Sequence, residues 1–198
     1  MKALLPFLTL LAMSAQTPAT KLIEGDPTSP VRILIYEDLQ CPDCANFRKM
    51  MDTDLIPRFK DKVAFEHRDF PLARHPWARS AAIAANYFQT ISPELAIEFR
   101  KATMSSQTSI TAENFRAHLT SFAQTHNIDP GKAVAALSDK ALEADVESSY
   151  REGIARGIAR TPTVLVNGDP FIETFQAADI IRSIERELAF ASSKAGKP

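Results

Sequence analysis

Cys41 and Cys44 are the only two cysteines of the chain, and they are separated by two residues in Cys41-Pro42-Asp43-Cys44. This C-x-x-C spacing is typical of thiol–disulfide exchange, in which one thiolate attacks a disulfide and a neighbouring thiol resolves the mixed disulfide. A disulfide that closes so small a loop would stabilise the fold little, because its effect grows with loop length. The spacing therefore favours redox catalysis over a structural disulfide.

The elements around the pair suit this chemistry. The apolar run 31–36 directly before it predicts a buried strand, and a helix is expected to begin at the pair, run to about Leu55 and end near Pro57. At a helix start, free N–H groups and the positive end of the helix dipole would favour the thiolate of Cys41.

The rest of the pattern predicts an α/β fold. Residues 63–70 alternate apolar and polar side chains and complete a β-α-β unit with parallel strands. Residues 75–157 are rich in alanine and predict a helical insertion of four or five helices. The β pattern returns with a hairpin of strands 163–166 and 170–172 around Asn167-Gly168, followed by an amphipathic helix over 177–190.

The N-terminus has the features of an export signal. Lys2 precedes a short apolar run, 3–12, and small residues follow it, which places cleavage near 14–15 in a signal peptide of 1–19. The run is too short to span a membrane. We therefore expect an extracytoplasmic, for example periplasmic, protein.

Charge and histidine spacing make several partners and ligands unexpected. The net charge of −1 gives no reason to expect nucleic acid or an anionic membrane surface. No metal is expected, because the histidines lack paired ligand spacing, although a metallochaperone remains an alternative. The basic group after the second strand is interpreted as solvated, with a substrate contact as its alternative: His67, Arg68, Arg74 and His75.

Three motifs resemble those of the single-domain DsbA-type oxidoreductases. They are residues 37–44, the Phe70-Pro71-Leu72 segment with His75-Pro76, and Thr161-Pro162-Thr163 before a strand. The resemblance implies a thioredoxin fold over about 25–190. Its first part would be 20–74, its helical insertion 75–157 and its second part 158–191, with a disordered tail at 192–198.

The resemblance also implies roles for individual residues. Pro162 would be cis beside the sulfurs, and Thr161, with Pro42 and Asp43, would contact substrate. Glu37 is the nearest candidate for proton transfer with Cys44, because the acid that related proteins carry six residues before the first cysteine is replaced by isoleucine here. The Asp43 carboxylate would oppose the Cys41 thiolate and Arg160 would offset it, so the Cys41 pKa should be moderately lowered.

These features predict an exported thiol:disulfide oxidoreductase that introduces disulfides through Cys41 and Cys44. It would need no cofactor beyond its redox-active pair, act as a monomer on reduced or unfolded exported proteins, and be reoxidised by a quinone-linked membrane protein. The alternatives are a thiol reductase of the same fold and a non-catalytic thioredoxin-like module that binds peptides.

Overall fold

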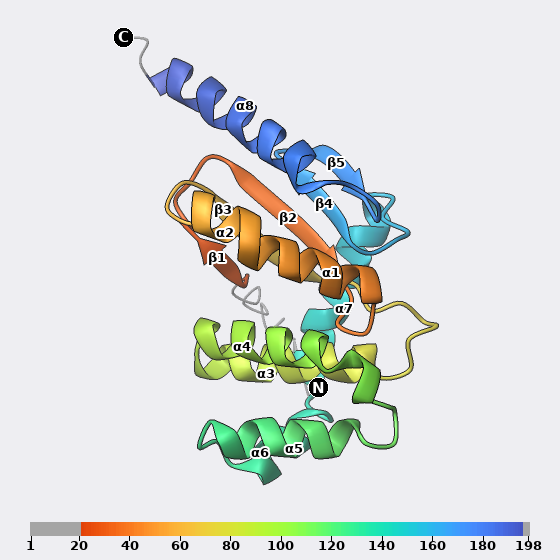
Figure 1. The fold of residues 1–198 in the computed structure, drawn as a ribbon. Helices are drawn as coiled ribbons and strands as arrows, with labels where there is room; N and C mark the ends of the chain where they lie inside the picture. The colour runs from red at the N-terminus through yellow and green to blue at the C-terminus, as the bar shows by residue number, and fades with distance from the viewer. Residues whose placement is uncertain (1–20, 196–198) are drawn as a thin grey trace, which may run out of the picture.

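The computed structural model describes residues 21–195, in which a mixed sheet of five strands has the order β1-β3-β2-β4-β5 (Figure 1). Its strands are β1 (Ile23–Gly25), β2 (Arg32–Glu37), β3 (Ala64–Asp69), β4 (Thr163–Val166) and β5 (Asp169–Ile172). Strands β2 and β3 are parallel, as the β-α-β prediction required, and the other pairs are antiparallel. The expected signal peptide, 1–19, lies outside the described residues.

Helices cover both faces of the sheet. On one face lie α1 (Pro42–Met50), the π-helical turn η1 (Met51–Leu55), α2 (Ile56–Phe59) and α8 (Ala177–Ala195). They enclose a core with side chains from β2, β3 and β4, including Ile33, Phe65 and Val164. On the other face, α7 (Lys140–Ala155) stacks Tyr150 on Phe70, with ring centroids 4.7 Å apart.

The first helix continues past Pro57, so the prediction that it ends there was wrong. The π turn η1 precedes the proline, and the N–H of Ile56 bonds the carbonyl of Met51, five residues back. In a regular α-helix the proline ring would meet the carbonyl four residues earlier. The widened turn changes this spacing, so the chain stays helical to Phe59.

The helical insertion has its own core. Besides α7 it contains α3 (Ala78–Ile91), α4 (Pro93–Ser105), the 3-10 turn η2 (Gln107–Ser109), α5 (Phe115–Thr125) and α6 (Pro130–Ala136), which agrees with the predicted four or five helices. Phe88, Phe99 and Phe122 pack against one another at centroid distances of 4.8–5.0 Å. The same apolar cluster reaches Cys41 and Cys44, so the insertion packs directly against the thiols.

The C-terminal part follows the predicted hairpin and helix. Asn167 and Gly168 both have positive φ, as a tight hairpin turn needs. Helix α8 extends away from the sheet to Ala195, so residues 192–195 are helical and the prediction of a disordered tail there was wrong (Figure 1). The α8 side chains that join the core lie before this extension, and they are Ile180, Ile181, Ile184, Leu188 and Ala191. Residues 196–198 lie outside the described part.

Strand β1 was not predicted, because three residues within a polar lead-in give no periodic signal. It pairs with β3 at the edge of the sheet.

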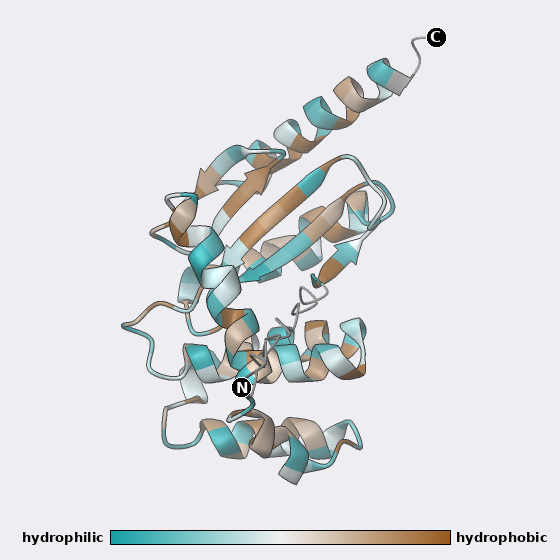
Figure 2. Ribbon diagram, turned by 180° about the vertical axis from the view of Figure 1, so that it is seen from behind, coloured by the Kyte–Doolittle hydropathy of each residue, from teal (hydrophilic) through white to brown (hydrophobic). Residues whose placement is uncertain are grey.

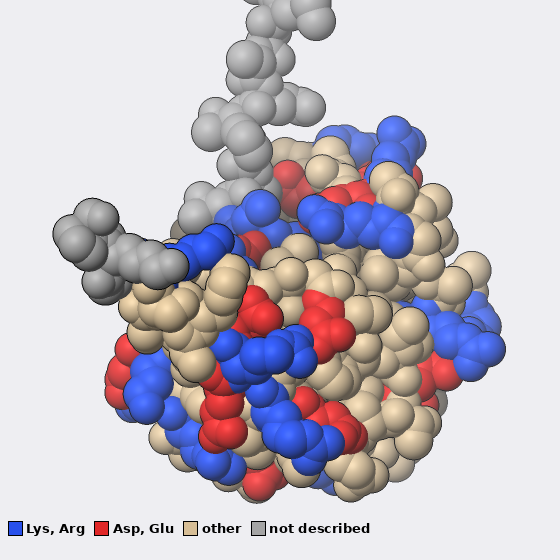
Figure 3. Space-filling model, turned by 90° about the horizontal axis from the view of Figure 1, so that it is seen from above, with Lys and Arg blue, Asp and Glu red and all other residues tan. Residues whose placement is uncertain are grey.

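Hydrophobic residues concentrate in the central strands (Figure 2). Acidic and basic residues are interspersed on the face in Figure 3. No helix within residues 21–195 is both long and apolar enough to cross a membrane.

Candidate active site

Cys41 is the N-cap residue of α1. Its backbone is extended (φ −76°, ψ 124°), and Pro42 begins the helix, where its missing N–H costs nothing. The backbone N–H groups of Asp43 and Cys44 are directed toward the Cys41 sulfur and help to lower its pKa. The helix start thus supplies the donors that the sequence predicted.

The two thiols have opposite pKa shifts. The hydrogen bond from the Cys44 thiol is the largest influence on Cys41 and lowers its pKa to about 6, although burial opposes this. Burial, followed by the neighbouring Cys41, raises the pKa of Cys44 well above its ordinary value. Cys41 is therefore suited to be the nucleophile and leaving group, and Cys44 to be the resolving thiol.

The Thr161–Pro162 peptide bond is cis, as the resemblance implied. The Cys41 thiol donates to the Thr161 carbonyl oxygen at 3.3 Å. The Thr161 hydroxyl has no hydrogen-bond partner of ordinary geometry among the described residues, yet it lies close enough to help lower the Cys41 pKa. The structure thus brings the thiol and the cis-proline loop together.

Arg160 and the residues between the cysteines are exposed. The Arg160 guanidinium binds Glu173 at 2.6 Å. The strongest influences on the Cys41 pKa are hydrogen bonds and burial, and neither the charge of Arg160 nor that of Asp43 is among them. Pro42 and Asp43 lie on the surface beside Cys41, where an incoming chain could meet them.

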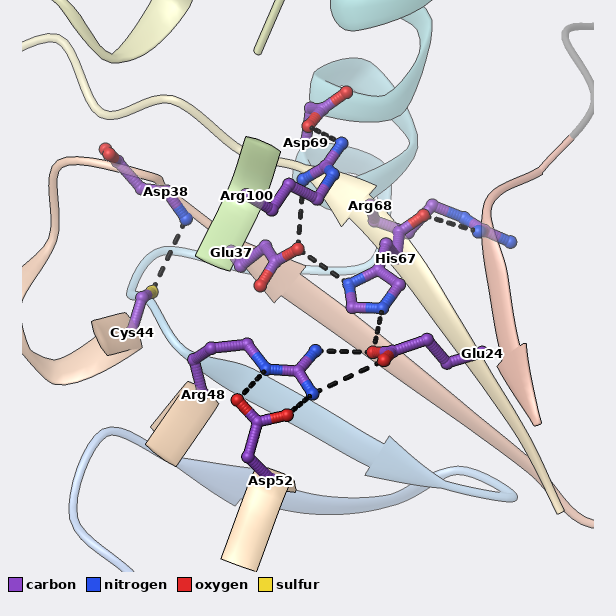
Figure 4. Close-up of polar contacts among 10 residues, drawn as sticks. All are labelled: Glu24, Glu37, Asp38, Cys44, Arg48, Asp52, His67, Arg68, Asp69 and Arg100. Carbon is purple, nitrogen blue, oxygen red and sulfur yellow. Dashed lines mark hydrogen bonds and ion pairs between the residues drawn. The ribbon is translucent and has the colours of Figure 1, made fainter. Parts of the chain in front are cut away.

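Glu37 ends β2 and is buried below the active-site helix (Figure 4). Its Oε1 atom accepts hydrogen bonds from His67 Nδ1 at 2.7 Å and from Arg100 at 3.0 Å. Burial would raise the pKa of Glu37, but these cations outweigh burial and lower it. The resulting negative charge contributes to the raised pKa of Cys44.

Glu37 belongs to a buried chain of ion pairs that sequence reasoning missed (Figure 4). We call this set the ion-pair chain: Asp69, Arg100, Glu37, His67, Glu24, Arg48, Asp52 and Lys101. It joins β1, β2 and β3 to α1, η1 and α4, and Asp52 and Lys101 bring it to the surface. Except for Arg48 and Asp52, which are four residues apart, its partners are far apart in sequence, so no local pattern could reveal the whole set.

The interpretation of His67 and Arg68 as solvated was wrong. All six residues of β3 are buried, because the strand lies inside the sheet and the insertion covers its polar side chains. Arg68 binds Glu66 at 2.5 Å and Glu152 of α7 at 3.1 Å. The alternation of β3 thus marks two buried faces that both carry ion pairs, with His67 on one face and Glu66 and Arg68 on the other.

Asp38 is a second residue that sequence reasoning missed. Its backbone N–H donates to the Cys44 sulfur at 3.4 Å, and its carboxylate is fully buried. The carboxylate accepts from the Gln40 N–H at 2.7 Å, the Leu72 N–H at 2.8 Å and His75 Nδ1 at 2.7 Å. The Asp38-x-Gln40 turn was a usable local signal, since aspartate commonly bonds the N–H two residues on.

The insertion also binds the active-site loop directly. Gln107 of η2 donates to the carbonyl oxygens of Leu39 at 2.8 Å and Cys41 at 3.0 Å. The Gln40 side chain accepts from the Trp77 N–H at 2.9 Å. The loop between β2 and α1 is therefore held on both sides, and nothing in the sequence marks Gln107 for this role.

The two hollows and the other acidic and histidine side chains of the described residues offer no second site for chemistry. Hollows of about 450 and 470 Å³ lie between β5 and α8 and between α4 and α5, and neither is lined by a cysteine. No group of three or more histidine, cysteine, aspartate or glutamate side chains within 21–195 is placed to hold a metal ion. The chemistry that the site can perform is thiol–disulfide exchange.

The sequence matches the thioredoxin family over residues 17–186. Among curated proteins, the Na(+)/H(+) antiporter NhaA 1 of Mycolicibacterium gilvum is 26% identical over 181 residues, which cover 85% of this chain and 27% of the antiporter. The chain thus spans about a quarter of the length of the curated relatives it matches.

Solved structures share the fold. Alpha-DsbA1 of Wolbachia pipientis matches with a TM-score of 0.77 and 20% identity, covering 88% of this chain and 94% of that one. The thiol-disulfide exchange protein alpha-DsbA2 of the same organism matches with a TM-score of 0.71 and 19% identity, covering 84% and 86%. The fold with its helical insertion is shared with alpha-DsbA1, and the family match over residues 17–186 shows that the chain belongs to the thioredoxin family.

Proposed function

We propose that the protein is an exported thiol:disulfide oxidoreductase that introduces disulfides into other proteins. The observation that carries this proposal is the opposite shift of two neighbouring thiols, with the Cys41 pKa at about 6 and the Cys44 pKa well above its ordinary value. A structural pair has no need of a stabilised thiolate.

In the oxidising direction, a substrate thiolate attacks the Cys41 sulfur of the Cys41–Cys44 disulfide. The bond between the cysteines breaks, a mixed disulfide with Cys41 forms, and Cys44 leaves as a thiolate and takes up a proton. A second substrate thiolate then attacks the substrate sulfur of the mixed disulfide and releases Cys41 as a thiolate. The substrate loses two electrons and two protons, and the enzyme becomes a dithiol.

The Cys41 pKa supports this direction. A stabilised thiolate favours the reduced enzyme and makes the disulfide a stronger oxidant. The value of about 6 lies between those of thioredoxin, about 7, and DsbA, about 3.5. We therefore expect a reduction potential between about −270 mV, that of thioredoxin, and about −120 mV, that of DsbA.

The cellular setting is part of the proposal. Residues 1–19 would act as a signal peptide, the substrates would be reduced exported proteins, and a quinone-linked membrane protein would reoxidise the monomeric enzyme. The shared fold with alpha-DsbA2, a thiol-disulfide exchange protein, supports the reaction class. Antiport is not included, because the match covers only 27% of the antiporter.

The first test is the equilibrium reduction potential of the Cys41–Cys44 pair. Protein without residues 1–19 is equilibrated in graded glutathione buffers, and its free thiols are counted by alkylation and mass. A potential above about −200 mV supports a disulfide donor. A value near −270 mV identifies a reductase. A pair that stays oxidised throughout contradicts catalysis.

Cys41→Ser separates a catalyst from a binding module. The variant should lose all disulfide transfer to a reduced test protein, because its hydroxyl cannot replace the thiolate. If wild-type protein transfers no disulfide but binds an unfolded polypeptide, and the variant binds it equally well, the protein is a non-catalytic binding module. Metal present in equimolar amount after reducing purification would identify a metallochaperone.

A further inference from the structure

We propose that His75 is a positioning residue for the resolving cysteine. Through the Asp38 carboxylate it holds the Asp38 backbone N–H that hydrogen-bonds the Cys44 sulfur. The inference rests on the proposed function, because it concerns the step in which Cys44 reacts. It adds a residue from outside the C-x-x-C motif and the cis-proline loop.

The contacts form a short path from the surface to the sulfur. His75 Nδ1 lies 2.7 Å from Asp38 Oδ2, and the Asp38 N–H lies 3.4 Å from the Cys44 sulfur. A carboxylate only accepts, so Nδ1 must carry the proton and donate. The Asp38 side chain has no exposed area, whereas that of His75 is 15% exposed. His75 therefore supplies a side-chain donor to a carboxylate that solvent does not reach.

Within residues 21–195, Asp38 pairs with no arginine or lysine, in contrast to Glu37, which pairs with Arg100. Its other two contacts are the backbone N–H groups of Gln40 and Leu72. Without His75, the carboxylate would keep only these two donors inside the protein. Because an unsatisfied buried carboxylate is costly, we expect it to turn toward water and take the Asp38 backbone with it.

His75 is itself held in place. Its N–H donates to the Leu72 carbonyl at 2.9 Å, and its carbonyl accepts from the Ala78 N–H at 3.2 Å. The imidazole therefore projects from a fixed turn between β3 and α3. The hydrogen bond between His75 and Asp38 joins this turn to the active-site loop. The position of Asp38 therefore depends on an element outside the loop.

The Asp38 N–H acts on Cys44 against the other influences. Burial, Cys41 and the charge of Glu37 disfavour the Cys44 thiolate, whereas this N–H favours it. In resolution, the Cys44 thiol loses its proton and its sulfur attacks Cys41. The bond between Cys41 and the bound thiol breaks, the Cys41–Cys44 disulfide forms, and the leaving thiolate takes up a proton. Losing the N–H should slow this step and spare the first attack by Cys41.

Glutathione provides a direct test. Reduced protein without residues 1–19 is mixed with oxidised glutathione, quenched in acid at intervals, and its glutathione adduct is followed by mass. The first rate reports attack by Cys41, and the second reports resolution by Cys44. In His75→Gln, the amide sits at the Nε2 position and the donor to Asp38 is lost. We expect resolution to slow about fivefold or more, as the loss of one hydrogen bond implies, with the first rate unchanged.

Two variants serve as matched controls. His75→Asn places an amide N–H near the Nδ1 position and should restore resolution to the wild-type rate. His126→Gln alters a half-buried histidine that pairs with Glu98 instead, and should change neither rate. If His75→Gln does not fold, Asp38→Asn is used, because its amide N–H2 replaces one acceptor oxygen and must face at least one N–H donor. It should slow the second step in the same way.

The outcomes separate the two proposals. If oxidised glutathione leaves wild-type protein as a dithiol, or forms an adduct that Cys44 never resolves, the proposed function fails. If wild-type protein resolves the adduct and His75→Gln resolves it equally fast, the role of His75 is overturned. The role is also overturned if His75→Gln slows both steps alike, or if His75→Asn fails to restore the second.

Discussion

His67 Nδ1 lies 2.7 Å from Glu37 Oε1, and its Nε2 lies 3.1 Å from Glu24 Oε2, so one buried imidazole bridges two buried carboxylates. The ion-pair chain holds four carboxylates and three side chains that are always cationic at neutral pH. It is balanced only when His67 is protonated. The charge beneath the active-site helix therefore depends on this one histidine.

The stability of the protein should fall as the pH rises through the His67 pKa. Burial opposes the charge of His67, but Glu37 and Glu24 outweigh burial and raise its pKa. A raised pKa contributes stability in full below the unfolded value of about 6.5, and this contribution is lost as the pH rises through the folded value. In urea titrations of oxidised protein, the free energy of unfolding should decline from about pH 6.5 upward, and decline less in His67→Gln.

His118 is the control for that experiment. Burial lowers its pKa below the unfolded value, so its contribution to stability rises rather than falls with pH, and His118→Gln should not remove the decline. A decline as steep in His67→Gln as in wild-type protein would contradict the assignment.

Removing Arg100 should destabilise the protein strongly. Its guanidinium binds Glu37 at 3.0 Å and Asp69 at 2.7 Å, and all three side chains are at most 5% exposed. Arg100→Met leaves two buried carboxylates without this partner, and the expected loss in free energy of unfolding is about 3–5 kcal/mol. Lys101→Met, at a 40% exposed side chain, should cost less than about 1 kcal/mol. If urea titrations give the two variants equal losses in free energy of unfolding, the burial of the Arg100 ion pairs does not determine their contribution to stability.

The Cys44 thiol should control the acidity of Cys41. Its hydrogen bond is the largest influence that lowers the Cys41 pKa to about 6. Cys44→Ala removes this donor, and the midpoint of thiolate absorbance against pH should rise toward the ordinary value of about 8.5. Cys44→Ser keeps a donor and should rise less. Midpoints in both variants equal to that of wild-type protein would show that the Cys44 thiol does not acidify Cys41.

Gly153 of α7 should tolerate no side chain. A Cβ atom there would lie 2.6 Å from the Phe70 ring, which is held between Tyr150 and Tyr36. Gly153→Ala should therefore destabilise the fold by about 1–3 kcal/mol, although alanine is the better helix former. At Gly131, a Cβ would meet only the Asp129 side chain, at 3.2 Å, so Gly131→Ala is the control. A stabilised Gly153→Ala in thermal unfolding would mean that Phe70 can move.

Local patterns predicted the parts of the fold that local interactions determine. Strands β2 and β3, the Asn167-Gly168 hairpin and the insertion helices follow from periodicity and turn residues. The cysteine spacing located the thiols, and the resemblance implied the cis bond at Pro162. The tolerance of the first helix for Pro57 was not predictable, because a π turn leaves no recognisable pattern of residue types.

The polar layer beneath the site was beyond sequence reasoning for a different reason. Glu24 and Arg48 are 24 residues apart, and Glu37 and Arg100 are 63 apart. Each of these residues taken alone favours a solvated surface. Only the tertiary fold, which brings α1 to β1 and α4 to β2, makes them partners, and a single sequence does not contain that packing in local form.

The depth of the thiols has a consequence for timing. Cys41 is 3% exposed and Cys44 1%, beside a cis-proline loop whose Thr161 is 1% exposed. A substrate thiol on a rigid, folded surface could not reach the Cys41 sulfur, whereas a substrate cysteine on an unfolded segment of chain could. Under the proposed function, the enzyme would serve newly exported polypeptides during a brief interval and ignore them once folded. The burial of the thiols would therefore limit disulfide formation to the time before a substrate folds, whatever the sequence of that substrate.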